Sequence, residues 1–261
     1  MHNITAIIQA RVGSTRLPGK VFLKLEGKKV LEHIIERVKS SNFIEDIVVA
    51  TTVSKKDLEI VKFCSSIGIS VYCGSEEDVL DRYYQTARLF KMKHIVRITS
   101  DCPLMDPKVI DKVLSLHLRK KSDYTSNTLE ETYPDGQDVE IFTFEALKIA
   151  WMNAKLPSER EHVTPYIRKN SRFKKSNLKC TKDYSNKRWT LDNPEDYKFI
   201  KEVYKNLYNK RKLFGMKEVL EYIKTNPKIE KINHYIARNE GYLKSLKNDK
   251  NLKLVNPKNT K

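Results

Sequence analysis

The chain has 261 residues and carries 50 Lys and Arg against 33 Asp and Glu, which gives a formal net charge of +17. This length is sufficient for one large α/β domain with a substantial core. No apolar run approaches the length that crosses a bilayer, and the N-terminal residues lack the features of a secretory signal, so we expect a cytoplasmic protein without membrane insertion.

The composition narrows the ligand classes further. The positive charge favours anionic ligands, but the basic residues spread along the chain without a repeated basic-aromatic pattern, so nucleic acid is not the expected partner. The four cysteines form no Cys-x-x-Cys pair, which argues against a zinc site and a disulfide framework. We expect reduced thiols at Cys64, Cys73, Cys102 and Cys180.

Apolar periodicity predicts alternating strands and helices along most of the chain. The expected strands cover residues 4–8, 47–50, 69–72, 95–98 and 139–142. The expected helices cover residues 30–38, 58–64, 79–90, 109–118, 144–153, 194–207 and 216–223. This order predicts an α/β fold with a mostly parallel central sheet and helices on both faces, whose ligands lie at the carboxyl ends of the strands.

Two segments depart from this alternation. Residues 123–139 form a polar stretch, and we expect it to be an active-site wall or an interface arm, because long polar excursions in compact domains are usually functional. Residues 244–261 contain six Lys and one Asp. We expect residues 1–247 to form a single domain and residues 248–261 to be a disordered tail with too little apolar surface to offset the entropy of ordering.

The most informative motif follows the first expected strand. Residues 9–19 read Gln-Ala-Arg-Val-Gly-Ser-Thr-Arg-Leu-Pro-Gly and precede Lys20. A loop rich in Gly and Ser that also carries Arg11, Arg16 and Lys20 suits phosphate binding, because amides can face the anion while cations close over it. The string is neither a Walker loop nor a dinucleotide fingerprint. A solvated basic turn is the alternative interpretation.

This string resembles the signature of the sugar-nucleotide cytidylyltransferases, the superfamily of CMP-KDO synthetase, and especially its branch named for spore coat polysaccharide biosynthesis protein F. The resemblance extends from the first strand to about Leu246 and includes Asn239-Glu-Gly-Tyr-Leu243. It implies a Rossmann-like nucleotidyltransferase fold of the glycosyltransferase A type. It also implies a homodimer, in which the excursion at about residues 123–170 meets both the acceptor and the second subunit.

Two aspartates are the expected metal ligands. Asp101 follows the strand at 95–98, where a carboxylate faces the ligand crevice, and Asp192 precedes the expected helix at 194–207. The alternatives are an Asx turn at Asp101 and a helix cap at Asp192. By resemblance both aspartates bind Mg²⁺, which takes one or two carboxylates together with substrate phosphates.

The resemblance also implies the ligand contacts. The expected nucleotide-binding residues are Ala10, Arg11, Gly13, Ser14, Arg16, Lys20, Ala50, Thr51, Gly74, Ser75 and Thr99. The expected acceptor-binding residues are Asp135, Gly136, Glu140, Glu161 and His162, in strings that look like the spore coat branch and unlike the sugar-acid synthetases. Without the resemblance, a histidine such as His162 is more often structural than catalytic, and Glu161 is a charged residue at the start of a helix.

The resemblance implies an Mg²⁺-dependent cytidylyltransferase. An acceptor oxygen of a sugar, a sugar acid or a small phosphorylated molecule would attack the α-phosphorus of CTP and release pyrophosphate, giving a precursor of a surface polysaccharide. The expected catalytic residues are Arg11, Lys20, Asp101 and Asp192. The alternative, suggested by the positive charge and the tyrosines, is a non-catalytic protein that binds nucleotides or nucleic acid.

Overall fold

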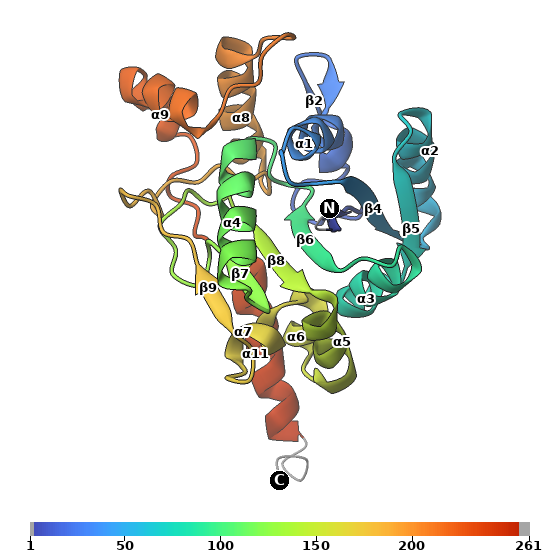
Figure 1. Ribbon diagram of the computed structural model, residues 1–261. Coiled ribbons are helices and arrows are strands. Elements are labelled where there is room, and N and C mark those ends of the chain that lie inside the picture. The colour runs from blue at the N-terminus through green and yellow to red at the C-terminus, as the bar shows by residue number, and fades with distance from the viewer. Residues whose placement is uncertain (1–2, 256–261) are drawn as a thin grey trace.

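A seven-stranded sheet lies at the centre of the computed structural model, which describes residues 3–255 (Figure 1). In order across the sheet, the strands are β5 (Ser70–Gly74), β4 (Asp46–Thr52), β1 (Ile4–Gln9), β6 (His94–Thr99), β8 (Glu140–Thr143), β7 (Tyr124–Ser126) and β9 (Lys175–Asn177). β8 runs antiparallel to both of its neighbours, and the other adjacent pairs are parallel. The expected mostly parallel sheet is confirmed.

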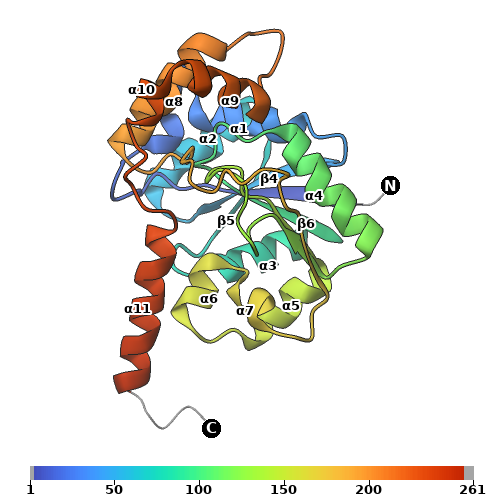
Figure 2. The same ribbon diagram turned by 90° about the vertical axis from the view of Figure 1, so that its left-hand side faces the viewer.

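Helices cover both faces of this sheet (Figure 2). One face carries α1 (Val30–Lys39), α2 (Leu58–Ser66), α4 (Pro107–Lys120), α8 (Pro194–Leu207) and α9 (Met216–Thr225). The other carries α3 (Val79–Leu89), α5 (Phe144–Asn153), α6 (Pro157–His162) and α7 (Pro165–Lys169). Each face has its own apolar core, and successive residues of β1 alternate between the two cores, with Ile7 in one and Ile8 in the other.

The other elements are short, except for the last helix. They are η1 (Lys20–Phe22), β2 (Lys24–Leu25), β3 (Lys28–Lys29), η2 (Lys55–Asp57), α10 (Pro227–Glu230) and α11 (Glu240–Val255). β2 and β3 pair as a small antiparallel ribbon. All four cysteines are free thiols. No helix within residues 3–255 is long and apolar enough to cross a membrane.

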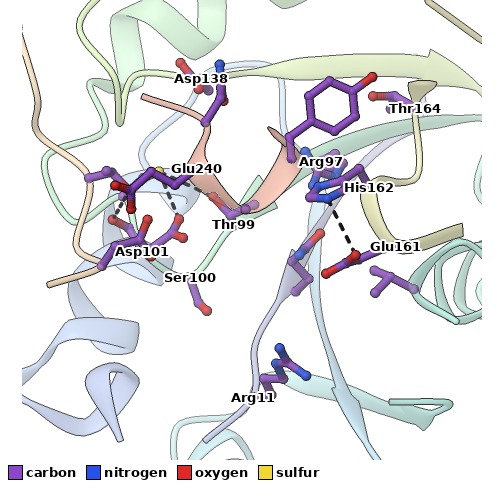
Figure 3. A pocket seen from close by; sticks show the side chains of 18 of the residues that line it. Arg11, Arg97, Thr99, Ser100, Asp101, Asp138, Glu161, His162, Thr164 and Glu240 are labelled. Atoms are coloured by element: carbon purple, nitrogen blue, oxygen red, sulfur yellow. Dashed lines mark hydrogen bonds and ion pairs between the residues drawn. The ribbon is translucent and has the colours of Figure 1, made fainter. Parts of the chain in front are cut away.

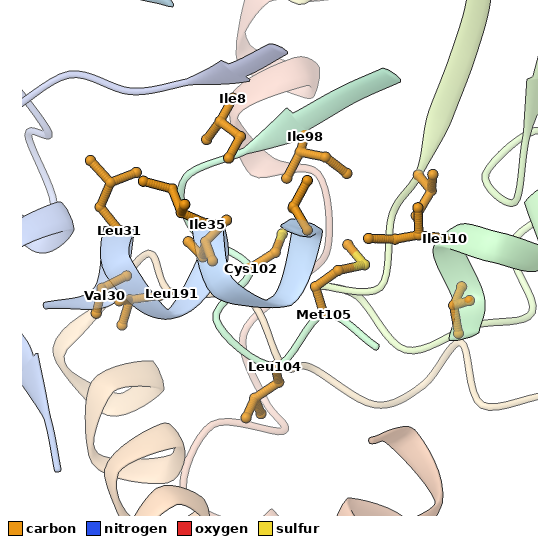
Figure 4. Close-up of a cluster of buried hydrophobic side chains, with 14 of the residues drawn as sticks. Ile8, Val30, Leu31, Ile35, Ile98, Cys102, Leu104, Met105, Ile110 and Leu191 are labelled. Carbon is orange, nitrogen blue, oxygen red and sulfur yellow. The ribbon is translucent and has the colours of Figure 1, made fainter. Parts of the chain in front are cut away.

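The loops that carry the two expected metal ligands are anchored in the core. Cys102 and Leu191, next to Asp101 and Asp192, are buried in the apolar cluster beneath β1 and β6. Figure 4 shows both side chains in this cluster, close to α1. The amide of Leu191 also donates a hydrogen bond to the carbonyl of Asp101 (2.8 Å), which joins the two loops directly. Buried neighbours therefore fix the backbone at both carboxylates.

The polar stretch at 123–139 contains a strand, β7, that apolar periodicity does not predict. β7 is fully buried although its sequence is Tyr-Thr-Ser. The Tyr124 hydroxyl donates a hydrogen bond to Glu140 (2.6 Å), and the Thr125 hydroxyl is 3.1 Å from the ring of His117. Because these polar groups find partners inside the protein, the segment is buried without an apolar alternation.

The expectation of a disordered tail from residue 248 is wrong for residues 248–255, which continue α11. Asp249 is 5% exposed and accepts hydrogen bonds from the amide (3.0 Å) and the hydroxyl of Ser158. This buried carboxylate, which satisfies the first turn of α6, orders a segment whose apolar content is low. The expected boundary at residue 247 thus falls inside α11, and residues 256–261 of the expected tail lie outside the described residues.

Gly136 brings the excursion into contact with residues 187–190. Its φ is +101°, and a Cβ at this position would lie 2.6 Å from the carbonyl carbon of Trp189 and 2.7 Å from the amide nitrogen of Thr190. The adjacent carbonyl of Asp135 accepts a hydrogen bond from the amide of Trp189 (2.7 Å). Glycine tolerates both this backbone conformation and this close approach.

We expect Gly136→Ala to lower the free energy of unfolding by about 2–3 kcal/mol, because it adds backbone strain to an overlap with backbone atoms. Gly68→Ala is the matched control. Gly68 also has a positive φ, +70°, but nothing lies within 4 Å of its Cβ position, so the loss should be about 1 kcal/mol. Urea unfolding measures the free energy of unfolding of both variants. Equal losses would show that the close approach to the Trp189 backbone does not affect stability.

Candidate active site

A cavity of about 810 Å³ lies at the carboxyl ends of β1 and β6 (Figure 3). Its wall comes from the loop after β1, the start of α3, the loop after β6 and the excursion. The wall is completed by α6, by residues 188–192 and by the start of α11. The cavity therefore lies at the edge of the sheet where the alternating order of strands and helices predicts ligands.

Most of the expected site residues line this cavity. Those that do are Ala10, Arg11, Ser14, Arg16, Lys20, Thr99, Asp101, Asp135, Glu140, Glu161, His162 and Asp192. Those that do not are Gly13, Ala50, Thr51, Gly74, Ser75 and Gly136. In this second group, Ala50 and Thr51 are wholly buried, and the Ala50 carbonyl accepts a hydrogen bond from the amide of Ala10 (3.1 Å). Contacts of this group with a ligand stay predictions.

Lys20 lies between the two expected metal ligands. Its Nζ is 3.2 Å from Oδ2 of Asp101 and 2.8 Å from Oδ1 of Asp192, and it donates to the carbonyl of Leu191 (3.0 Å). Burial disfavours the charge on Lys20, but the two carboxylates outweigh burial and raise its pKa. Burial also disfavours the charge on Asp101, yet the Lys20 ammonium lowers the pKa of Asp101 to about 2. Two carboxylates from distant parts of the chain thus converge on one cation.

The other two cations of the phosphate loop, residues 9–20, also contact carboxylates. Arg11 is 3.3 Å from Glu76. Arg16 is 3.1 Å from Asp192 and 2.5 Å from Glu240, the first residue of α11. The side chains of Arg11 and Arg16 are 47% and 36% exposed. Because water screens exposed ion pairs, an anionic ligand can replace these carboxylates at low cost.

A buried aspartate fixes the backbone of the phosphate loop. Asp57 at the end of η2 is 2% exposed and accepts hydrogen bonds from the amide of Val12 (2.7 Å) and the hydroxyl of Thr52. The amide of Gly19 donates to the carbonyl of Val12 (3.1 Å), and Gly19 has a φ of +67°. The loop is therefore closed on itself and tied to the strand end beside it, which limits the conformations that its cations can take.

Arg188 joins the Asp192 loop to the excursion. Its guanidinium is 5% exposed, and its Nε and one terminal nitrogen each lie 2.9 Å from a carboxylate oxygen of the fully buried Asp196. The same guanidinium is 3.2 Å from Asp135 and 3.7 Å from Asp192. Asp196 also accepts hydrogen bonds from the amides of Asp192 and Asn193, just before α8. One buried ion pair thus fixes both the expected metal ligand and the expected acceptor residue.

A second arginine, Arg238, gathers the carboxylates of the excursion. It donates to Asp138 (2.7 Å) and lies 3.5 Å from Glu131 and 3.9 Å from Asp135. Burial and the charge of Asp138 raise the pKa of Asp135 to about 7, although Arg238 and Arg188 oppose the shift. The carboxyl groups of Glu131, Asp135 and Asp138 share the guanidinium groups of Arg188 and Arg238. The guanidinium of Arg188 also forms an ion pair with Asp196. Carboxyl groups therefore outnumber the guanidinium groups around Arg188 and Arg238.

Glu140 at the start of β8 forms an ion pair with Arg97 of β6. Their side chains are 6% and 15% exposed. The hydroxyls of Tyr124 and Thr164 donate to Oε1 of Glu140, each at 2.6 Å. Burial opposes the ionisation of Glu140, but the Arg97 guanidinium outweighs burial and lowers its pKa. Glu140 is already engaged by protein groups, and its contact with an acceptor stays a prediction.

Glu161 and His162 of α6 meet the last helix. The hydroxyl of Ser245 in α11 lies 2.6 Å from a carboxylate oxygen of Glu161 and 3.0 Å from Nε2 of His162. The ring of Tyr242 lies edge-on to the His162 ring, with 5.1 Å between centroids. Burial lowers the pKa of His162, and the nearby Arg97 guanidinium lowers it further. Figure 3 shows Glu161 and His162 on one side of the cavity.

The start of α3 contributes a buried cation to the cavity. Arg82 is 2% exposed and donates a hydrogen bond to the carbonyl of Ser75 (3.0 Å). Among the described residues, no carboxylate lies within ion-pair distance of it, and its Nε has no partner. Nearby, Asp78 binds the guanidinium of Arg160 through both oxygens and so fastens α6 to α3. Arg82 offers hydrogen-bond donors and positive charge to a ligand.

The arginines that connect the Asp192 loop to the carboxyl groups of residues 131–138 were not predicted from the sequence. Arg188 and Arg238 carry no expected role, although Arg188 lies four residues before Asp192 and Arg238 directly precedes the string at residues 239–243. Glu240 and Tyr242 lie inside that string and also line the cavity. An arginine next to a motif was the available signal, but it does not reveal which carboxylates the arginine will meet.

The chain is similar to known cytidylyltransferases. The profile of the family described as Cytidylyltransferase matches residues 5–232. Spore coat polysaccharide biosynthesis protein SpsF of Bacillus subtilis is 33% identical over 235 residues, which cover 87% of this chain and 96% of that protein. The 3-deoxy-manno-octulosonate cytidylyltransferase of Geotalea daltonii is 29% identical over 188 residues, which cover 69% of this chain and 72% of that protein. A solved cytidylyltransferase structure from Leptospira borgpetersenii, 36% identical, superposes with a TM-score of 0.85 over 91% of this chain and 100% of that chain.

We expect Glu140→Gln to lower the free energy of unfolding at neutral pH by about 3–5 kcal/mol, because it leaves the Arg97 guanidinium buried without its counter-charge. The folded protein lowers the pKa of Glu140, so its carboxylate stabilises the fold above the pKa of the unfolded chain, and this contribution is lost as the pH falls through the lowered value. The difference between the two proteins should therefore shrink below about pH 4.

Denaturant unfolding at several pH values measures this difference, and Glu221→Gln is the matched control. Glu221 on α9 is 65% exposed and has only a 3.8 Å contact with Lys217, so its loss should stay within about 0.5 kcal/mol. If both variants lose the same stability, the Arg97–Glu140 pair does not support the fold.

Proposed function

The chain belongs to the cytidylyltransferase family, and from this premise we propose that it transfers CMP from CTP to a small acceptor and releases pyrophosphate. The observation that carries the proposal is the convergence of Asp101, Lys20 and Asp192 beside the phosphate loop. Cations for a triphosphate and carboxylates for a metal ion are the two requirements of nucleotidyl transfer, and both meet at one end of the cavity.

In this proposal, the phosphate loop neutralises the triphosphate. Phosphate oxygens would replace the carboxylate oxygens that now contact Arg11, Arg16 and Lys20. An acceptor oxygen attacks the α-phosphorus, and a new oxygen–phosphorus bond forms as the bond to pyrophosphate breaks. The same cations stabilise the negative charge of the leaving pyrophosphate. Positioning and electrostatics are sufficient for this reaction, so no covalent nucleophile is required.

Asp101 and Asp192 fit a magnesium ion. Both carboxylates already share one cation, the Lys20 ammonium. Within residues 3–255 there is no group of three or more His, Cys, Asp or Glu side chains that could hold a metal ion, so a metal here would rely on these two carboxylates. Magnesium usually takes one or two carboxylates and completes its shell with water and substrate phosphates, so this pair is chemically sufficient. A bound ion would offset the charge that grows on the phosphate oxygens.

We propose that the acceptor, a sugar, a sugar acid or a small phosphorylated molecule, occupies the half of the cavity between the polar stretch at 123–139 and α6. Carboxylates such as Asp135 and Glu161 can accept hydrogen bonds from sugar hydroxyls, and His162 can donate or accept one. The similarity to a protein named for spore coat polysaccharide biosynthesis supports a product destined for a surface polysaccharide. A homodimer formed through the excursion stays a prediction.

The test is pyrophosphate release from a panel of nucleoside triphosphates, with sugar acids, sugar phosphates and other small phosphorylated acceptors, with and without Mg²⁺. We expect CTP and Mg²⁺ to support release. Asp101→Asn and Asp192→Asn should each reduce turnover by about two orders of magnitude or more while the fold is kept, because each removes a negative ligand of the metal rather than a core contact.

Asp183→Asn is the matched control for the loss of one carboxylate, since Asp183 is exposed and does not line the cavity. It should leave turnover unchanged. Full activity of both the Asp101 and the Asp192 variants would rule out the metal assignment. Release from every triphosphate at the same rate would rule out the preference for CTP.

We expect Lys20→Ala to weaken the binding of CTP more than the binding of CMP, because the proposal assigns the Lys20 charge to the outer phosphates. Calorimetric titration of both nucleotides measures the two affinities. Equal losses for CTP and CMP would place Lys20 at the α-phosphate or away from the phosphates altogether.

A further inference from the structure

The last helix completes the cavity although it lies beyond the segment that defines the family. The family profile ends at residue 232, whereas Glu240, Gly241 and Tyr242 of α11 line the cavity. Figure 2 shows α11 beside α6 and extending away from the sheet, and α6 is the element on which it packs. The wall of the acceptor half thus depends on an element that is added to the core of the fold.

Within residues 240–250 of α11, the residues that contact α6 through hydrogen bonds are polar. Ser245 contacts Glu161 and His162, and one turn further along Asp249 accepts two hydrogen bonds from Ser158. Leu243, in the first turn of α11, is 53% exposed. A helix that is held by hydrogen bonds and buries little apolar surface has a low free energy of local opening. A change at the first turn of α11 can therefore alter the position of the helix on α6.

The first turn of α11 is tied to the phosphate loop by one ion pair. One terminal nitrogen of Arg16 is 2.5 Å from Glu240, and the other is 3.1 Å from Asp192. The Glu240 side chain is 43% exposed, so solvent screens the pair. A phosphate group presents paired oxygens with the same geometry and more charge than a carboxylate, and it is the stronger partner for a guanidinium.

We propose that Glu240 occupies Arg16 when no nucleotide is bound and that a nucleoside triphosphate displaces it, which releases the first turn of α11 and changes the acceptor wall at Tyr242 and Ser245. The proposal rests on the proposed function in taking a triphosphate as the ligand of the phosphate loop. The nucleotide half and the acceptor half are then coupled through one helix. By linkage, whatever fixes α11 in its docked position must also weaken triphosphate binding.

Calorimetric titration with CTP tests the competition. Glu240→Gln keeps the size of the side chain and removes its charge, so it should bind CTP about two- to fivefold more tightly than the unmodified protein. Glu221→Gln, which makes the same change of net charge at an exposed site on α9, is the matched control and should bind CTP as the unmodified protein does. Cytidine, which has no phosphate, should not distinguish the three proteins.

Amide hydrogen exchange tests the coupling. In the unmodified protein, CTP should speed exchange at residues 243–247 of α11, and cytidine should not. In Glu240→Gln, exchange of these amides should be fast already, and CTP should add little. The helices α8 and α9 provide internal controls, because α11 packs mainly on α6.

Each outcome decides between the hypotheses. If CTP binds but Glu240→Gln leaves its affinity unchanged or lowered, Glu240 does not compete for Arg16 and the inference is wrong. If Glu240→Gln tightens binding but CTP leaves exchange of α11 unchanged, the coupling to the acceptor half is wrong. If no nucleoside triphosphate binds to either protein, the proposed function itself fails, and the inference fails with it.

Discussion

The contact of Lys20 with Asp101 and Asp192 is the interaction on which the cavity depends. The proposed function needs several cations for a triphosphate and one or two carboxylates for a magnesium ion, all close together. Neither set is stable alone in a partly buried cavity, because unpaired charges there are costly. In this structure the two sets neutralise each other, since Lys20 and Arg16 both contact Asp192. The ligand-free protein is therefore stable, and its charges are already in place.

The reversal of one strand gives this cavity its second half. β8 is antiparallel to β6, with Arg97 paired to Glu140, so β8 begins at the edge of the sheet where β6 ends. The residues just before β8 therefore meet those just after β6, which brings Asp135 to the same cavity as Asp101. A parallel strand in this position would carry its preceding loop to the opposite edge. Gly136 then allows the excursion to pack tightly against the Trp189 backbone.

The parallel part of the fold could be predicted from apolar periodicity, and the phosphate loop from one continuous string. Both signals are local in the sequence. The partners of Lys20 lie 81 and 172 residues away, and no spacing indicates that they meet. Their convergence was implied by resemblance to a family alone. The burial of β7 and the order of α11 escaped prediction for a related reason. Tyr124 and Asp249 are buried because polar groups distant in sequence form hydrogen bonds with them. The apolar content of a segment does not indicate such partners.

The attachment of α11 by a few polar contacts has a consequence for the divergence of such enzymes. The scaffold from β1 to α9 packs around two apolar cores, so substitutions of its buried residues are costly. The last helix contacts α6 through the side chains of Ser245 and Asp249, and its first turn forms part of the wall that an acceptor would touch. Substitutions at Gly241 and Tyr242, in the first turn of this helix, would change which molecules fit, while the phosphate loop stays unchanged. New substrate preferences can thus evolve within one helix without passing through unstable intermediates.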